Sequence, residues 1–236
     1  METATIIAIL CLAALVHGTL GFGTGLVAMP LLTLLLGVRD ATALVAFVIL
    51  STTVVVFAQG WRSLRWRSSL RLTVGAALGI PLGILVLTQA PANVVQRGLG
   101  VSLIVIGLYS LVAPRLVELH HPWWAYASGF ASGLLGGAYN TNAPPVVLYG
   151  ALRRWPPPVF RATLQAYFVP TAALIWAGHG LTGLWSREIF GWYVLYLPFG
   201  VAVLWVGQRL SGLLPERSFD RLLYAVIIVL GVTLLI

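Results

Sequence analysis

Charged residues are scarce in this chain, and their scarcity excludes a water-soluble fold. Only 8% of its 236 residues are charged and 59% are hydrophobic, with a mean hydropathy of +0.96. A soluble domain carries about 25% charged residues. Lysine is absent, so all fourteen basic residues are arginine, and the net charge of +8 comes from arginines in short loops rather than from a nucleic-acid-binding patch. We therefore expect an all-α protein that crosses a membrane several times.

Cysteine and acidic residues are equally rare. Cys11 is the single cysteine, which excludes an internal disulfide and argues against a metal cluster. No carboxylate is expected to be buried, so the usual proton or sodium relay of an active importer is missing. An enzyme would need a nucleophile–base pair or a metal centre, and the sequence predicts neither an enzyme, a metal site nor a cofactor. The six acids fall at run ends or in loops: Glu2, Asp40, Glu118, Glu188, Glu216 and Asp220.

Ten apolar runs follow one another along the chain. A helix needs about 20 residues to cross ~30 Å of hydrocarbon, and the second and seventh runs are much shorter than that. Each follows a break, so we expect two hairpins that return to the side from which they start. The first run lacks a basic n-region and a cleavage site, and we interpret it as a retained membrane segment. The runs are 4–20, 26–38, 42–61, 70–90, 97–113, 123–138, 143–152, 160–179, 189–208 and 219–236.

Arginines are distributed unevenly between the two sides that these hairpins define. Arg39, Arg97 and Arg187 fall on one side, and the other eleven fall on the opposite side. By the positive-inside rule the arginine-rich side is cytoplasmic. Both termini are then expected to face outward from a bacterial inner membrane. The eleven are Arg62, Arg65, Arg67, Arg71, Arg115, Arg153, Arg154, Arg161, Arg209, Arg217 and Arg221.

The two breaks are similar in sequence. Aligning Gly18 with Gly133 pairs GTLGFGTGLVAMP with GLLGGAYNTNAPP and brings Pro30 onto Pro145. Further on, IPLG at 80–83 answers LPFG at 197–200. Each half holds five runs, an odd number, so the half 119–236 starts on the opposite side from the half 1–118. The sequence predicts an inverted repeat, as in secondary transporters whose sites form where broken helices meet.

The segments GFGTGLVAMPLL (21–32) and GLLGGAYNTNAPPVVLYG (133–150) also resemble a known family. Two halves that each open with such a break, a proline and an apolar run resemble the TauE/SafE family of sulfite and organosulfur-anion exporters, over essentially the whole chain. The resemblance implies a carrier that exports a small sulfur oxyanion or sulfonate by alternating access. An importer or proton-coupled carrier of the same or another small anion is the alternative. Either kind of carrier could form a homodimer.

A helix break inside a membrane exposes the amide groups of the helix that follows. These N–H donors and the helix dipole place roughly half a positive charge at the break, which an oxyanion can neutralise. Pro30 and the pair Pro144–Pro145 are expected in the first turns of the two short helices, where a missing N–H costs little. The expected substrate-binding residues are His17, Gly21, Gly23, Thr24, Gly25, Gly137, Tyr139, Asn140, Thr141, Asn142 and Gln165.

Each of these residues also has a simpler interpretation. Small residues in membrane helices commonly serve close packing, and His17 or Gln165 could bond only to a neighbouring helix. His179 is expected at the membrane interface, near the end of its helix. An anion channel is a second functional class, distinguished by conductance far above carrier turnover. A structural scaffold would not need two matched breaks.

Overall fold

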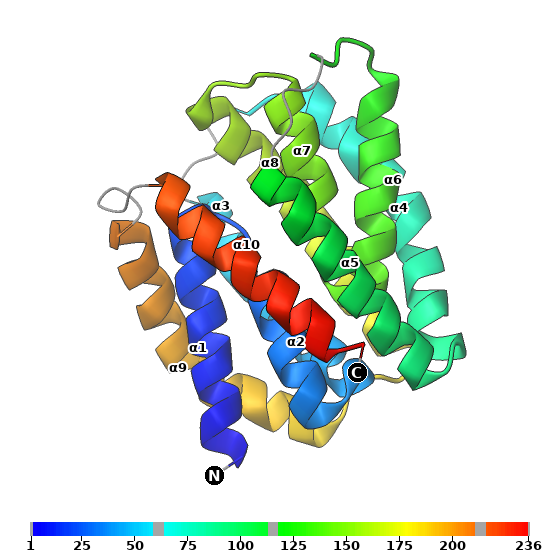
Figure 1. The fold of residues 1–236 in the computed structure, drawn as a ribbon, viewed down its shortest axis with the longest axis vertical. Helices are drawn as coiled ribbons and strands as arrows, with labels where there is room; N and C mark the ends of the chain where they lie inside the picture. The colour runs from blue at the N-terminus through cyan, green and yellow to red at the C-terminus, as the bar shows by residue number, and fades with distance from the viewer. Residues whose placement is uncertain (1, 59–63, 113–117, 211–215, 236) are drawn as a thin grey trace.

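Ten α-helices make up the protein in the computed structural model, which describes residues 2–58, 64–112, 118–210 and 216–235, without the side chains of 216–223 (Figure 1). No strand occurs in these ranges, so the all-α expectation is confirmed. Among the described residues, five helices are long and apolar enough to cross a membrane: α1, α3, α4, α5 and α9. The helices are α1 (Glu2–Leu20), α2 (Thr24–Leu36), α3 (Val38–Ala58), α4 (Trp66–Gln89), α5 (Ala92–Val112), α6 (Trp123–Tyr139), α7 (Ala143–Leu152), α8 (Pro157–Leu181), α9 (Arg187–Leu210) and α10 (Glu216–Thr233).

Helices α2 and α7 are short, as the sequence predicts. They have 13 and 10 residues, which correspond to about 20 and 15 Å at the α-helical rise. Each follows a longer helix after three residues, 21–23 in the first half and 140–142 in the second. Neither is long enough to cross ~30 Å of hydrocarbon. The two breaks therefore lie well inside the bundle rather than at its ends.

Apart from the two breaks, the described helices begin and end at two ends of the molecule (Figure 1). At one end α3, α5, α7 and α9 finish and α4, α6, α8 and α10 start; we term it the arginine-rich end. The described arginines at or near it are Arg65, Arg67, Arg71, Arg153, Arg154, Arg161 and Arg209. Arg62 and Arg115 lie outside the described residues. The N- and C-termini both lie toward the other end, near the starts of α3, α5 and α9.

Arg39, at that other end, has a structural partner. Its guanidinium donates hydrogen bonds to the carbonyl oxygens of Leu87 (3.3 Å), Thr88 (3.0 Å) and Ala90 (3.3 Å). These carbonyls belong to the last turn of α4 and the residue after it, where helical partners are missing. A cation there also complements the negative end of the helix dipole. Arg39 thus ties the start of α3 to the end of α4.

The two halves of the chain interleave rather than form separate bodies. Helix α4 of the first half packs mainly against α6 of the second, and α9 of the second packs mainly against α1 of the first. Helices α5 and α10 pack on each other, as do α3 and α8. The fourth helix of each half therefore lies against the first helix of the other half. Pro81 and Pro198 lie inside these two fourth helices.

Glycines permit the closest of these crossings. Gly75, Gly79 and Gly83 of α4 face the backbone of α6, and a Cβ at any of them would overlap a carbonyl oxygen of α6. The reverse holds for Gly129, Gly133 and Gly137 of α6, which face carbonyl oxygens of α4. Spacing of four residues places three such positions along one helix face, and small residues let two backbones approach closely in a membrane. The packing interpretation of glycine is therefore correct for this pair of helices.

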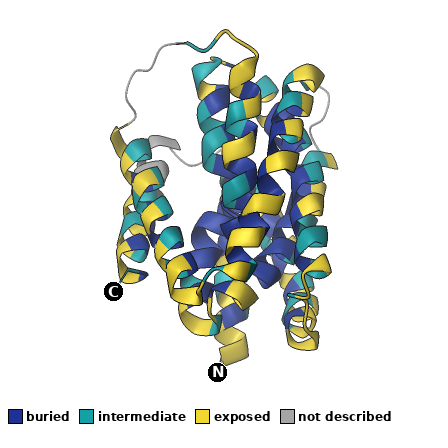
Figure 2. Ribbon diagram, turned by 90° about the vertical axis from the view of Figure 1, so that its right-hand side faces the viewer, coloured by how far each residue is buried: buried dark blue, intermediate teal, exposed yellow. Residues whose placement is uncertain are grey.

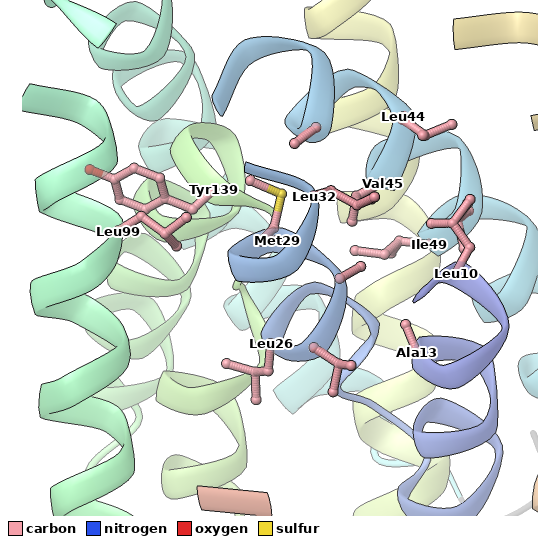
Figure 3. Close-up of a cluster of buried hydrophobic side chains, with 14 of the residues drawn as sticks. Leu10, Ala13, Leu26, Met29, Leu32, Leu44, Val45, Ile49, Leu99 and Tyr139 are labelled. Carbon is pink, nitrogen blue, oxygen red and sulfur yellow. The ribbon is translucent and has the colours of Figure 1, made fainter. Parts of the chain in front are cut away.

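The core gathers around the first hairpin. In Figure 3, Met29 and Leu32 of α2 lie between Leu99 of α5 on one side and Leu44 and Val45 of α3 on the other. All five side chains are fully buried. Figure 2 shows that exposed residues lie on the outer surfaces of the helices, and many of these are large and apolar, including Leu78, Val105 and Phe199. An apolar exterior over a packed interior is the pattern expected of helices surrounded by lipid.

Candidate functional site

The first break is made by glycines in left-handed backbone conformations. Helix α1 ends at Leu20, and Gly21 (φ 82°) and Gly23 (φ 108°) follow it. Such values favour glycine because a Cβ would collide with the backbone. The Gly21 amide still donates to the His17 carbonyl at 2.7 Å, and the chain then turns so that Thr24 begins α2. The break is thus a sharp, defined turn between two helices.

The second break uses asparagine where the first uses glycine. Asn140 follows α6 with φ 55°, a conformation that asparagine tolerates better than most residues. Its amide donates to the Gly136 carbonyl at 2.9 Å, and the Thr141 amide reaches the Leu135 carbonyl at 3.4 Å. These two bonds close α6 in the manner of a helix C-cap. Helix α7 then begins at Ala143 with Pro144 and Pro145 in its first turn, as predicted.

Pro30 does not occupy the position expected from the sequence. It lies inside α2, beyond the first turn, because α2 starts at Thr24 directly after the glycines. Its missing N–H therefore removes a helical hydrogen bond to the Leu26 carbonyl, four residues earlier. The alignment of Pro30 with Pro145 holds in sequence, but the two prolines have different places in their helices.

The two breaks are in contact with each other. A Cβ on Gly25, in the first turn of α2, would overlap the carbonyl oxygen of Asn140. Only a glycine permits this approach, which joins the start of α2 to the end of α6. Residues more than a hundred positions apart in the chain therefore meet at one point of the bundle.

A small pocket lies where the breaks meet. Its volume is about 20 Å³, which is room for little more than one water molecule. Both polar and apolar side chains line it. It is lined by His17, Phe22, Gly23, Thr24, Gly25, Leu26, Ile49, Thr53, Asn140, Thr141, Asn142, Ala143 and Phe168. We term it the break pocket.

Several polar atoms of the break pocket have no hydrogen-bond partner within the described part of the protein. They are His17 Nε2, Thr53 Oγ1, Thr141 Oγ1 and Asn142 Nδ2. All four residues are at least 95% buried. A buried polar group without a partner costs free energy, about 1–3 kcal/mol each. Their concentration in one place indicates a site that a polar ligand could complete.

Other polar atoms at the breaks are already paired. His17 Nδ1 and the Thr24 hydroxyl share a hydrogen bond of 2.8 Å across the first break. Asn140 Nδ2 donates to the Thr42 carbonyl of α3 at 2.6 Å. Gln165 Nε2 of α8 donates to the Gly21 carbonyl, so Gln165 supports the turn from outside the pocket. These bonds fix the turns to α3 and α8.

Four expected site residues do not line the break pocket. Gly21 and Gln165 adjoin it at the first break, whereas Gly137 and Tyr139 lie away from it. Gly137 packs against the Ile80 carbonyl of α4. The carbonyl oxygen of Gly137 accepts a hydrogen bond of 3.1 Å from His179 Nε2. Tyr139 points toward Gly98 of α5 and lines a different, apolar cavity. Neither contributes a side chain to the pocket. His179 is fully buried in the bundle, close to the end of α8, and the expectation that it lies at the depth of the membrane interface stays a prediction.

Sequence reasoning missed six residues that line the pocket: Phe22, Leu26, Ile49, Thr53, Ala143 and Phe168. Thr53 belongs to a hydroxyl-rich stretch, Ser51–Thr53, inside the third apolar run. Hydroxyl groups inside an apolar run are a signal of a polar site. Which of these hydroxyls faces the pocket depends on the rotation of the helix about its axis, and the sequence does not give that rotation. Thr52 bonds to the Val48 carbonyl of its own helix at 2.8 Å, whereas Thr53 faces the break pocket.

A second, half-open cavity of about 710 Å³ adjoins the break pocket, and exposed residues such as Val105 form part of its wall. It shares Phe22 and Leu26 with that pocket and extends along α7 from Pro144 to Leu152, toward the arginine-rich end. We term it the vestibule. None of its lining residues is charged, and Tyr109, Ser110 and Tyr224 are its polar side chains. The full lining is Phe22, Leu26, Val105, Ile106, Tyr109, Ser110, Pro144, Pro145, Val147, Leu148, Ala151, Leu152 and Tyr224.

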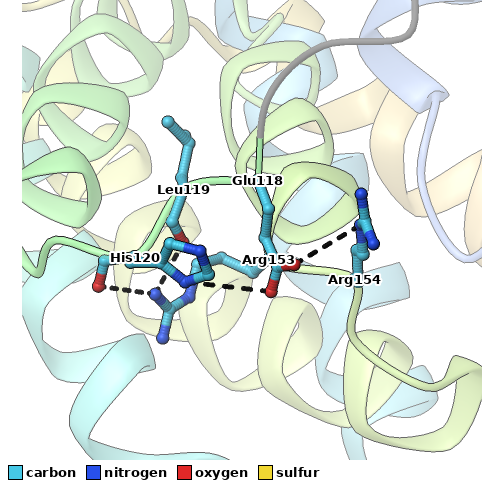
Figure 4. A network of polar contacts seen from close by, with 5 residues as sticks. All are labelled: Glu118, Leu119, His120, Arg153 and Arg154. Carbon is cyan, nitrogen blue, oxygen red and sulfur yellow. Dashed lines mark hydrogen bonds and ion pairs between the residues drawn. The ribbon is translucent and has the colours of Figure 1, made fainter.

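A polar cluster at the arginine-rich end holds the segment before α6 against the segment after α7 (Figure 4). Arg153 donates to the carbonyls of Leu119 (2.7 Å) and His120 (2.8 Å). Arg154 lies 3.5 Å from a carboxylate oxygen of Glu118, with its side chain 73% exposed. An ion pair this exposed contributes little to stability. The second hairpin is therefore anchored mainly through Arg153.

The comparisons with known proteins agree with this architecture. A family model described as sulfite exporter TauE/SafE matches residues 6–234, which include both breaks and every helix in whole or in large part. No curated protein and no solved structure matches the chain. Members of the matched family are membrane transporters of sulfite or related anions. A ten-helix membrane bundle whose two helix breaks meet around buried polar groups accords with that match, and the chain belongs to the sulfite exporter TauE/SafE family.

Proposed function

We propose that the protein exports a small sulfur-containing anion, such as sulfite or a sulfonate, by alternating access from a bacterial inner membrane. The observation that carries the proposal is the break pocket, where two helix breaks from different halves of the chain meet around unpartnered polar atoms. The residues proposed to bind the substrate directly are His17, Thr24, Thr141 and Asn142, together with Thr53. The glycines and Gln165 shape and support the turns.

The two breaks supply different kinds of donor. At the first, amides in the first turn of α2 adjoin the pocket, and the helix dipole adds partial positive charge. At the second, Pro144 and Pro145 have no N–H, so α7 offers few free amides. The side chains of Thr141 and Asn142 stand in the place of those amides. An oxyanion, with acceptors in several directions, suits such a mixed set of donors.

An inverted repeat of 1–118 and 119–236 would give the site its two-sided access. The packing supports it, because α4 with α6 and α9 with α1 are equivalent pairs under exchange of the halves. The hairpins approach the pocket from opposite ends of the bundle. In the described conformation the pocket is too small for a multi-atom anion, so transport requires these pairs to move apart on one side at a time.

Export of an anion needs no coupling cation, whereas import does. The membrane potential is negative inside, and each elementary charge that crosses is worth about 2.3 kcal/mol per 100 mV. A divalent anion that leaves therefore gains roughly 4–5 kcal/mol at that potential. An importer would have to overcome the same contribution with coupled cations, yet none of the described acidic residues lines the break pocket.

Purified protein in liposomes tests this proposal. With a potassium gradient, valinomycin and independently determined protein orientation, making the arginine-rich side negative should speed movement of sulfite or a sulfonate toward the other side. The His17→Gln variant should retain this dependence on potential. Flux that ignores the potential, follows an imposed proton gradient and loses that response in His17→Gln would instead establish a proton-coupled carrier. Conductance far above carrier turnover would establish a channel.

A further inference from the structure

The break pocket and the vestibule adjoin each other, and the linings of both are mainly apolar. What distinguishes the break pocket is its buried polar atoms without a partner among the described residues, which come from His17, Thr53, Thr141 and Asn142. Phe22 and Leu26 belong to both walls. Phe22 stands between Gly21 and Gly23 at the turn of the first break, so it lies at the boundary of the two cavities.

Such a pair is poorly matched to a bare inorganic anion. A small, strongly hydrated anion in the vestibule would lose water without gaining a charged or amide partner. An apolar group in the same place would gain from burial, at about 25 cal/mol per Å². Pockets for organic ligands combine these two features, an apolar wall and a few convergent polar groups.

We propose that the substrate is an amphiphilic organic anion, an alkanesulfonate with an unbranched apolar chain. Its sulfonate group binds the polar atoms of the break pocket once Phe22 moves aside, and its chain lies in the vestibule along α7. This inference rests on the proposed function and narrows it from small sulfur anions in general to those with an apolar tail. Sulfite and methanesulfonate then occupy only the polar part of the site.

A homologous series of ligands tests the inference. Binding of sulfite, methanesulfonate, propanesulfonate and hexanesulfonate to purified protein in nanodiscs is measured by isothermal titration calorimetry. Affinity should rise by up to about fourfold per methylene group, which is the gain from fully burying a CH₂ group. A flat series with sulfite still bound overturns the inference and leaves the proposed function standing. Binding of none of these anions overturns both.

A variant that fills the vestibule separates binding from partition into lipid. Ala151→Trp places a large ring in the vestibule from α7 and should abolish the gain with chain length while methanesulfonate still binds. Ala77→Trp, at an exposed position of α4 outside the vestibule, is the matched control and should keep the gain. Ser110→Trp fills the cavity from α5 and replaces Ala151→Trp if that variant does not fold. A gain that persists in a folded filled variant overturns the inference.

Discussion

Hydrogen bonding divides the polar residues at the helix breaks into two groups. Asn140 and Gln165 have donors committed to backbone carbonyls of α3 and of the first break, so their loss would disturb the turns themselves. Thr53, Thr141 and Asn142 each keep an atom without a partner in the break pocket. The second group is the one whose substitution should change ligand affinity with little effect on folding.

Two adjacent threonines of α3 provide a matched pair for this distinction. Thr53→Val removes a hydroxyl that faces the break pocket, and we expect anion affinity to fall by about 1.5–3 kcal/mol, the value of a hydrogen bond to a charged group. Thr52→Val removes a hydroxyl that bonds to its own helix and should leave affinity nearly unchanged. Calorimetric titration of both variants checks this. Equal losses in the two would remove Thr53 from the site.

Asn142 tests the second break in the same way. Asn142→Leu should weaken anion binding by about 1.5–3 kcal/mol because its Nδ2 group has no partner among the residues that the structure describes. Arg154→Ala, in the exposed cluster at the arginine-rich end, should leave affinity nearly intact, since Arg154 does not line the pocket and its side chain is 73% exposed. Binding measurements on folded protein compare them. Unchanged affinity in Asn142→Leu would exclude the second break from the site.

At the scale of single residues, the sequence predicts which segments form the site. It does not predict equally well which atoms of those segments face the break pocket. The breaks and their polar residues are visible as departures from an apolar background. The roles of Gly137 and Tyr139 are not, because residues on one helical turn face different neighbours and the sequence alone does not give the helix rotation. Gly137 faces α4, Tyr139 faces α5, and Asn142 faces the break pocket.

Helix lengths and helix contacts depend on different information. The short runs at 26–38 and 143–152 predict the 13-residue α2 and the 10-residue α7 because apolar length is a local property. The pairing of α4 with α6 is a property of two distant segments. Regular glycine spacing marks a close-packing face on each of them, but it does not say which helix lies against which.

Substitution within the α4–α6 contact tests how much that contact stabilises the fold. Gly79→Ala places a Cβ against the Phe130 carbonyl, and we expect a loss of about 1–3 kcal/mol in unfolding free energy from overpacking. Gly191→Ala in α9, where a Cβ would meet nothing within 4 Å, should be neutral or slightly stabilising. Thermal unfolding in detergent compares the two. A Gly79→Ala protein as stable as wild type would show that the helices can separate without loss.

For the whole molecule, the uneven distribution of arginine sets the expected orientation. The helices alternate in direction, so each end of the bundle collects its own set of connections. The sequence alone is enough to predict the orientation, because the charge of the loops and the number of helices can be read without knowledge of the packing. The expected boundary at residue 118, by contrast, does not predict that the helices of the two halves interleave.

Single-cysteine labelling tests the orientation. In a Cys11→Ala background, Asn93→Cys lies at the end near the termini and His121→Cys at the arginine-rich end, both at exposed positions. A membrane-impermeant maleimide should label Asn93→Cys in intact spheroplasts and His121→Cys only after permeabilisation. The opposite pattern would place the arginine-rich end outside.

Helix α1 is synthesised long before α9, its main packing partner. About 167 residues separate the end of α1 from the start of α9, and at roughly 5–20 residues per second a ribosome needs about 8–33 s to supply them. During that interval Gly18, which packs on the α9 backbone, lacks its α9 neighbour, and the first break lacks the second until residues 140–142 have been synthesised. A nascent chain interrupted before α9 therefore leaves its earliest helix in the membrane without its main partner, where lipid or a quality-control protease would meet the face intended for α9.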